Sequence, residues 1–314
     1  MTAGTAGPTR DGGRLRNTAA PRGLRRPSTM RLRHAVRRIA AIVLAGAFST
    51  ACSSERAPSA GPGVRVLQPA LEMPGLDRSR TLRLYLPPGY DGGNARYPVI
   101  YMADGQNLFD DATSYAGEWG VDESMDELAR CCGFEAIVVG IDHGGERRMN
   151  ELSPWPNPGH GVAEGEAYLR FVVEVVKPFI DRSYRTRPGP ADTAIIGSSM
   201  GGLAAHYALL ARPDVFGRAG VLLPSYWFSE RAFDLAGSAD VTADARVFLY
   251  VGGAEGDRMV PDTERMHRLL RARLGERVVL EVAPEARHHE AAWRTAFPRV
   301  VRWLFEAPEA ASAR

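Results

Sequence analysis

The chain has 314 residues, of which 45% are hydrophobic and 24% are charged, so it can bury a sizeable core and is not globally disordered. Its three cysteines are too few for a disulfide scaffold. The net charge of +2 is unevenly placed: residues 1–52 carry ten arginines and one acid, Asp11, whereas the rest has 29 basic and 36 acidic residues. The part that can fold is mildly acidic, which argues against a nucleic-acid partner.

Residues 1–51 have the composition of an N-terminal targeting segment. Residues 1–29 are rich in Gly, Pro, Thr and Arg without an apolar period, which predicts a disordered leader or a start assigned too early, ahead of Met30. Residues 30–51 carry four arginines and then an apolar run that is too short to anchor the chain across a bilayer. This pattern is typical of a secretory signal peptide, so we expect an exported protein.

A cysteine follows the small residues that end this segment. It resembles the acylated cysteine of bacterial lipoproteins, although Ser49 stands where that motif usually has leucine. We therefore expect a lipid on Cys52 and attachment to the membrane at the cell envelope, on the periplasmic or extracellular face. Cleavage near Ala51 and simple secretion is the alternative. Residues 52–63, rich in Ser, Pro, Ala and Gly, are predicted to be a flexible linker.

The remainder is predicted to form one domain, residues 64–306, followed by a disordered tail, residues 307–314. Apolar or alternating runs predict strands at 81–86, 97–103, 135–142, 192–197, 218–223, 247–251 and 278–282. Apolar residues at spacings of three and four predict helices over 168–179, 199–211, 262–274 and 293–304. Pro298 is expected to kink or restart the last helix. This alternation predicts an α/β fold with a mainly parallel sheet and helices on both faces.

Two adjacent cysteines, Cys131 and Cys132, close a further predicted helix before Gly133. We expect them to be packed, reduced thiols, because free cysteine behaves as a small apolar residue. A vicinal disulfide is the alternative.

One motif carries most of the chemical information. Gly197, Ser199 and Gly201 form G-x-S-x-G between an apolar strand and an apolar helix. This is the sequence of a nucleophile elbow, in which a sharp turn exposes the serine hydroxyl above the sheet. The two glycines allow close backbone packing, and the helix N-terminus offers free N–H groups to a developing oxyanion. An ordinary glycine-rich turn is the competing interpretation.

A serine hydroxyl needs a base to become a good nucleophile, and after a nucleophile elbow the acid and then the histidine follow in the chain. His267 falls within a helix and is expected on the surface. His288 and His289 lie between the last strand and the last helix, which is the expected place of the base. We choose His288, with His289 exposed or supporting it.

The acid is expected after the strand at 247–251, where a glycine-rich loop carries Glu255 and Asp257. A carboxylate there can orient His288 and stabilise its imidazolium form. Glu255 is the first choice and Asp257 the second. The oxyanion hole needs two backbone N–H groups, which we assign to Met200, directly after the nucleophile, and to Gln106, in the loop after the strand at 97–103.

Seven segments in order resemble the putative-esterase family of α/β-hydrolases, which includes esterase D, siderophore esterases, feruloyl and acetylxylan esterases and mycolyltransferases. They are YLPPGY (85–90), YPVIYMADGQNLFD (97–110), GEWGVDE (117–123), VVGIDHGGERRMNELSPW (138–155), IIGSSMGGLAAHYAL (195–209), VGGAEGD (251–257) and HHEAAWRTAFP (288–298). DGQNLFD and GEW are most similar to the siderophore-esterase-like branch.

The resemblance implies an α/β-hydrolase fold with Ser199 as nucleophile, His288 as base and Glu255 as acid, and it places the second oxyanion donor on Gln106. His289 stands where the family commonly has asparagine. Some members of the siderophore-esterase-like branch work with a Ser–His dyad, so the resemblance leaves the role of Glu255 the least fixed. The implied activity is hydrolysis of a carboxylic ester through an acyl-enzyme.

We expect the substrate to be a small-molecule or glycan-linked ester, and siderophore lactone, feruloyl ester, acetyl ester and small thioester all stay open. Trp119, Tyr226 and Trp227 are candidates for an acyl or aromatic pocket, with plain packing as the alternative. Zinc spacing, a phosphate-binding loop and a dinucleotide fingerprint are missing from the sequence, so we expect neither metal nor cofactor. Two other functions stay open: an acyltransferase on the same machinery and a non-catalytic envelope binding protein.

Overall fold

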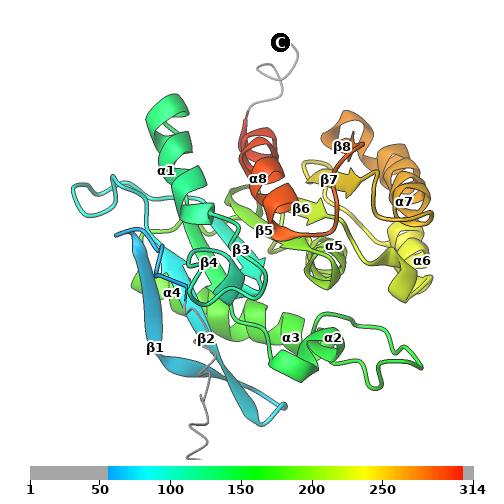
Figure 1. The fold of residues 1–314 in the computed structure, drawn as a ribbon, viewed down its shortest axis with the longest axis horizontal. Coiled ribbons are helices and arrows are strands. Elements are labelled where there is room, and N and C mark those ends of the chain that lie inside the picture. The colour runs from blue at the N-terminus through cyan, green and yellow to red at the C-terminus, as the bar shows by residue number, and fades with distance from the viewer. Residues whose placement is uncertain (1–55, 307–314) are drawn as a thin grey trace, which may run out of the picture. The chain divides into compact units, whose positions relative to one another are not determined.

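The computed structural model describes residues 56–306 (Figure 1). The leader, the signal peptide, Cys52 and the tail at 307–314 lie outside these residues. Eight strands form one sheet in the order β1-β2-β4-β3-β5-β6-β7-β8. The strands are β1 (Val64–Met73), β2 (Arg78–Tyr85), β3 (Val99–Ala103), β4 (Ile137–Ile141), β5 (Thr193–Ser198), β6 (Arg218–Leu222), β7 (Arg246–Gly252) and β8 (Val278–Ala283).

Six neighbouring strands, from β4 to β8, run parallel, whereas β1 and β2 add an antiparallel edge. All residues of β4, β5 and β7 are buried, as expected for strands covered on both faces. The predicted α/β fold with a mainly parallel sheet is confirmed.

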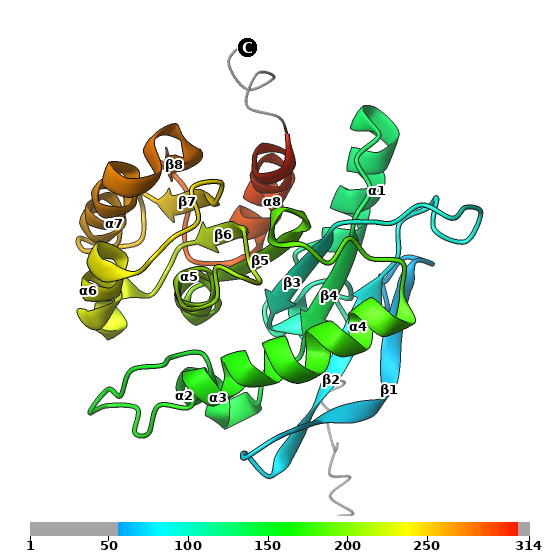
Figure 2. The ribbon, with the colours of Figure 1, turned by 180° about the vertical axis from the view of Figure 1, so that it is seen from behind.

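Helices cover both faces of the sheet (Figures 1 and 2). They are α1 (Val121–Cys132), α2 (Arg148–Glu151), α3 (Gly165–Arg170), a π-helical turn (Phe171–Val176), α4 (Lys177–Ser183), α5 (Met200–Ala211), α6 (Arg231–Ser238), α7 (Met259–Leu274) and α8 (Glu290–Phe305). The apolar faces of α1 and α8 pack on one side of the sheet, and those of α3 to α7 pack on the other. α8 continues through Pro298 as a single helix, so the proline does not divide it.

The sequence did not predict β1. This edge strand contains Pro69, and its pairing with β2 shifts register between Leu67 and Leu71. Proline is tolerated at a sheet edge because its missing N–H is not needed on the side without a neighbouring strand. In the sequence, however, a proline argues against a strand. The helix α6 was also not predicted.

Residues 56–61 form a strap that lies on the domain. The Ser59 N–H donates to Asp110 Oδ1 (3.1 Å), and the Gly61 N–H donates to Asp122 Oδ2 (2.7 Å). Arg56 contacts Ser114. The segment predicted as a flexible linker therefore has a docked part, while residues 52–55 lie outside the described residues.

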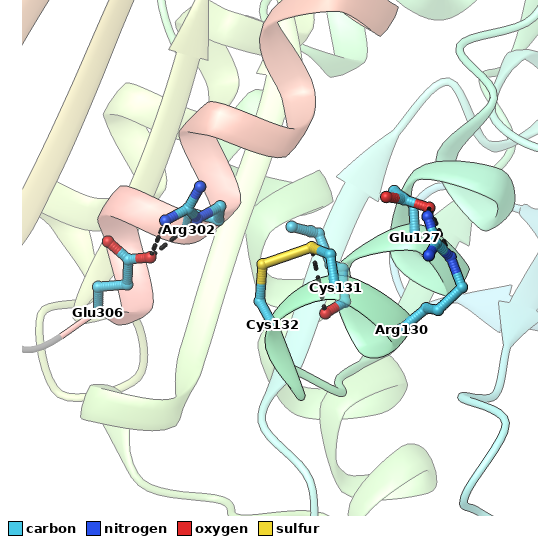
Figure 3. Close-up of a disulfide and its surroundings, with 7 residues drawn as sticks. Glu127, Arg130, Cys131, Cys132, Arg302 and Glu306 are labelled. Atoms are coloured by element: carbon cyan, nitrogen blue, oxygen red, sulfur yellow. Dashed lines mark hydrogen bonds and ion pairs between the residues drawn. A yellow bond between two sulfur atoms is a disulfide. The ribbon is translucent and has the colours of Figure 1, made fainter.

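Cys131 and Cys132, the last residues of α1, form a vicinal disulfide (Figure 3). This corrects the expectation of packed thiols, because both residues are exposed at the helix end instead of buried among apolar side chains. Across residues 56–306, no helix is long and apolar enough to cross a membrane.

Candidate active site

The predicted nucleophile and base, Ser199 and His288, both lie at the carboxyl edge of the parallel strands, which is where ligands usually bind to sheets of this kind. A cavity of about 430 Å³ opens there. It is lined by Asp104, Asn107, Tyr115, Ala116, His143, Arg148, Ser198, Ser199, His288, His289, Glu290 and Trp293. The segments after β3, β4, β5 and β8 thus contribute to one hollow, although they are far apart in the chain.

Ser199 stands at the junction of β5 and α5 in a strained backbone conformation. Its φ of 56° and ψ of −121° lie in a region that residues with a Cβ rarely adopt, at a cost of about 1–3 kcal/mol. A Cβ on Gly197 would lie 2.4 Å from the Gly201 carbonyl oxygen, so only glycine fits before this turn. The turn places the half-buried Ser199 in the cavity at the N-terminus of α5.

Ser199 Oγ lies 3.2 Å from Ser225 Oγ. Ser225 is buried in the loop after β6. Among the described residues, no hydrogen bond joins Ser199 to His288, although both line the cavity. The predicted nucleophile and base therefore share the site without a direct contact in this state.

His288 is held by a buried carboxylate. His288 Nδ1 lies 2.8 Å from Glu255 Oε2. The Glu255 side chain is 2% exposed, whereas that of His288 is 41% exposed. Because Nδ1 faces the carboxylate, Nε2 is the ring nitrogen that can exchange a proton at the cavity. Asp257, the second choice for the acid, is exposed.

The loops that carry the acid and the histidine touch directly. A Cβ on Gly252 would lie 2.3 Å from the Ala286 carbonyl oxygen, and the Ala254 N–H donates to the same oxygen (3.2 Å). The Gly252 N–H also donates to Glu255 Oε1 (3.2 Å). Gly252, the last residue of β7, is thus required for the approach that joins Glu255 to His288.

The two predicted oxyanion donors lie in the segments that follow β3 and β5. Gln106 belongs to a single 3-10 turn, Gly105–Asn107, and its Oε1 accepts the His143 N–H (3.0 Å). Met200 is the first residue of α5, where backbone N–H groups lack an acceptor in the helix. In the described part of the chain, neither the Gln106 nor the Met200 N–H donates to a protein acceptor.

A buried ion pair beside the elbow was not singled out as such from the sequence. Arg148 donates to both carboxylate oxygens of Asp104, at 2.6 and 2.8 Å. Burial alone lowers the pKa of Arg148, but the charge and hydrogen bonds of Asp104 raise it above its usual value. Asp104 adopts a left-handed conformation (φ 60°) just before the turn that carries Gln106. The pair therefore fixes the start of this turn.

His143 is a further cavity residue that the sequence analysis missed. Burial lowers its pKa, so the ring is neutral at pH 7. Its Nδ1 accepts the Gly145 N–H (2.9 Å), which leaves the proton on Nε2. The sequence does contain a signal for His143. The polar pair Asp142-His143 directly follows the buried strand β4, at the same edge of the sheet as the other site residues.

The structure corrects two of the three substrate-binding predictions. Trp119 is 3% exposed and packs behind Trp293, with ring centroids 5.4 Å apart. Tyr226 is 1% exposed, and its hydroxyl contacts His206 Nδ1 at 3.2 Å. Both are core residues, because their aromatic rings are buried against other side chains. Trp227 is 44% exposed and lies outside the cavity lining, so its role stays a prediction.

Within residues 56–306, no group of three His, Cys, Asp or Glu side chains could hold a metal ion.

The comparisons with known proteins identify the family of the chain. Residues 74–304 match the model of the family described as "Putative esterase". The chain belongs to this family. It is a carboxylic ester hydrolase, and the resemblance inferred from the seven sequence segments is confirmed.

Individual relatives are similar to the chain in sequence, and solved structures are similar to it in fold. The chain is 26% identical to the uncharacterized protein YbbA of Bacillus subtilis, over 72% of this chain and 93% of that protein. It is 28% identical to the ferri-bacillibactin esterase BesA of the same organism, over 45% of this chain and 52% of that protein. The enterochelin esterase of Shigella flexneri has a similar fold, with a TM-score of 0.65, 19% identity, and coverage of 80% of this chain and 60% of that one.

Proposed function

We propose that the protein is an exported serine esterase that works through an acyl-enzyme, with Ser199 as nucleophile, His288 as general base and Glu255 as the acid that orients it. The observation that carries the proposal is the Glu255–His288 contact at 2.8 Å, made by a buried carboxylate at the edge of the cavity that holds Ser199. A carboxylate in this place fixes the imidazole tautomer and stabilises its charged form.

The reaction begins when Ser199 Oγ attacks the ester carbonyl carbon and its proton passes to His288 Nε2. The carbonyl π electrons move to oxygen, where the Met200 and Gln106 N–H groups stabilise the oxyanion. Collapse expels the alcohol, which takes the proton from His288. Water, deprotonated by the same ring, then attacks the acyl-enzyme and restores Ser199.

For the substrate, we propose a siderophore lactone or a feruloyl or acetyl ester. The support is the family and the likeness to proteins named as siderophore esterases. The cavity volume of about 430 Å³ suits a small organic acyl group.

The test compares the wild type with Ser199→Ala on short p-nitrophenyl esters, a feruloyl ester and a siderophore trilactone. Hydrolysis should fall about ten-thousandfold or more in Ser199→Ala. Ser198→Ala is the matched control, since Ser198 is the adjacent serine on the cavity wall, and it should lose far less. Undiminished hydrolysis by Ser199→Ala would end the proposal, and the ranking of substrates by the wild type would identify the ester.

We propose further that the mature protein is lipidated at Cys52. The arginine-rich segment, the apolar run and the small residues before this cysteine support the proposal. Labelling of cells with a fatty-acid analogue should mark the wild type but not Cys52→Ala. Equal labelling of both, or of neither, would contradict lipidation at this residue.

A further inference from the structure

The loop after β6 presents a second hydroxyl to the nucleophile. Ser225 Oγ lies 3.2 Å from Ser199 Oγ, and Ser225 is 1% exposed. Within the described chain, Ser225 Oγ has no other hydrogen-bond partner. The Ser225 N–H also donates to the Ser199 carbonyl oxygen (3.1 Å), so the two serines are joined through backbone and side chain.

The same loop is fixed on both sides of Ser225. Leu223 adopts a left-handed conformation (φ 45°), and its N–H donates to the Tyr250 carbonyl oxygen (2.7 Å). Tyr226 is buried, and its hydroxyl contacts His206 Nδ1 on α5. Burial lowers the pKa of His206 to about 4, so this ring is neutral and places no charge against Tyr226. Ser225 therefore cannot swing away without breaking buried contacts.

We propose that Ser225 is a positioning residue that donates its hydroxyl proton to Ser199 Oγ and holds that oxygen for attack. The direction of this hydrogen bond follows from the need of the buried Ser225 hydroxyl for an acceptor. A buried O–H without an acceptor is costly, and Ser199 Oγ is the acceptor within reach. The Ser199 proton is then free to point into the cavity, where His288 can take it.

The inference rests on the proposed role of Ser199 as nucleophile. Ser225 neither gains nor loses a proton in the reaction. During attack, the Ser199 proton moves to His288 Nε2 and the Oγ–carbon bond forms, while Ser225 keeps its own proton. During deacylation, Ser199 Oγ leaves the acyl carbon with the electron pair and regains a proton from His288. A standing donor at Oγ stabilises the charge that develops on this oxygen in that step.

The test uses the purified protein with Ser225→Ala and Ser225→Thr. Ser153→Ala is the control, because Ser153 is a buried serine that bonds to Trp155 and does not line the cavity. Concentrations of working sites are measured by fluorophosphonate titration, and melting temperatures are recorded for all variants. We expect Ser225→Ala to lower kcat about tenfold with KM little changed, as for loss of one hydrogen bond in the transition state. Ser225→Thr keeps the hydroxyl and should recover most of kcat, while Ser153→Ala should keep the wild-type kcat.

A merely structural role would give a different pattern. It would lower the melting temperature or raise KM, and threonine, which adds a methyl group in a tight site, would be no better than alanine. Wild-type kcat in Ser225→Ala, an increased kcat, or equal loss in both Ser225 variants would overturn the inference. If Ser199→Ala retained hydrolysis, the proposed function would fail first, so the two failures are distinguishable.

Discussion

The nucleophile and the base of the candidate site are built in opposite ways. Ser199 follows β5, whose six residues are all buried, and its position is set by a strained backbone turn between a central strand and a helix. His288 sits in a loop, its side chain is 41% exposed, and its position depends on contacts with Glu255 and with the loop after β7.

This difference shows where the site is rigid and where it can adjust. The elbow shares the stability of the core, because moving Ser199 would disturb β5 and α5. The histidine loop is held by contacts with a second loop near the surface, so we expect it to be the part most sensitive to single changes there. We expect substitutions on the base side to reduce activity while the fold persists, and backbone changes at the elbow to damage the fold itself.

Among the substitutions that separate the two sides of the site, replacing the base gives the largest expected effect. His288→Ala should lower kcat about a thousandfold or more, because the Ser199 proton then has no acceptor. His289→Ala is the matched control, since this neighbour also lines the cavity but makes no contact with Glu255 among the described residues. Steady-state hydrolysis measures both. Equal losses in the two variants would contradict the choice of His288.

Replacing the acid should have a smaller effect. Glu255→Gln keeps the shape of the side chain but removes the charge that stabilises the imidazolium, so we expect a loss of about a hundredfold in kcat. Asp257→Asn, in the same loop, should stay close to the wild type because Asp257 is exposed. Wild-type activity in Glu255→Gln would instead indicate a Ser–His dyad.

The same small change at two glycines separates the two sides of the site. Gly197→Ala places a Cβ 2.4 Å from the Gly201 carbonyl oxygen inside the core, so it should lower the melting temperature strongly. Gly252→Ala places one 2.3 Å from the Ala286 carbonyl oxygen in the histidine loop, so it should cost about tenfold in kcat with a smaller change in melting temperature. A reversed pattern would contradict the contrast between core and loop.

Much of the fold could be predicted because buried parallel strands leave continuous apolar runs in the sequence. β5 and β7 are of this kind, and every residue in them is buried. β1 was missed because an edge strand with Pro69 and a register shift lacks that pattern. The pairing of Cys131 with Cys132 was not predicted because two adjacent cysteines give the same sequence pattern whether their thiols are reduced or bonded.

In the site, the sequence identified the residues that follow strands but not their contacts. The G-x-S-x-G motif located Ser199, and the loops after β7 and β8 located Glu255 and His288, which the structure brings together. Ser225 also follows a strand, β6, but a lone serine carries no signal until its hydroxyl is seen beside Ser199.

The aromatic residues show the limit most plainly. Trp119 and Tyr226 occupy loop positions in the sequence, yet their rings are buried against Trp293 and His206. Burying a large aromatic ring stabilises the fold, so many aromatic residues in loops pack into the core. A single sequence does not show which of them do so.

The central claim is that Ser199 is the nucleophile, and a fluorophosphonate adduct located by peptide mass spectrometry tests it most directly. Three serines lie at the site, Ser198, Ser199 and Ser225, so the position of the adduct discriminates among them. The account predicts one adduct per chain, on Ser199, with loss of ester hydrolysis in proportion to labelling. An adduct on Ser198 or Ser225, or full hydrolysis by the labelled protein, would contradict it.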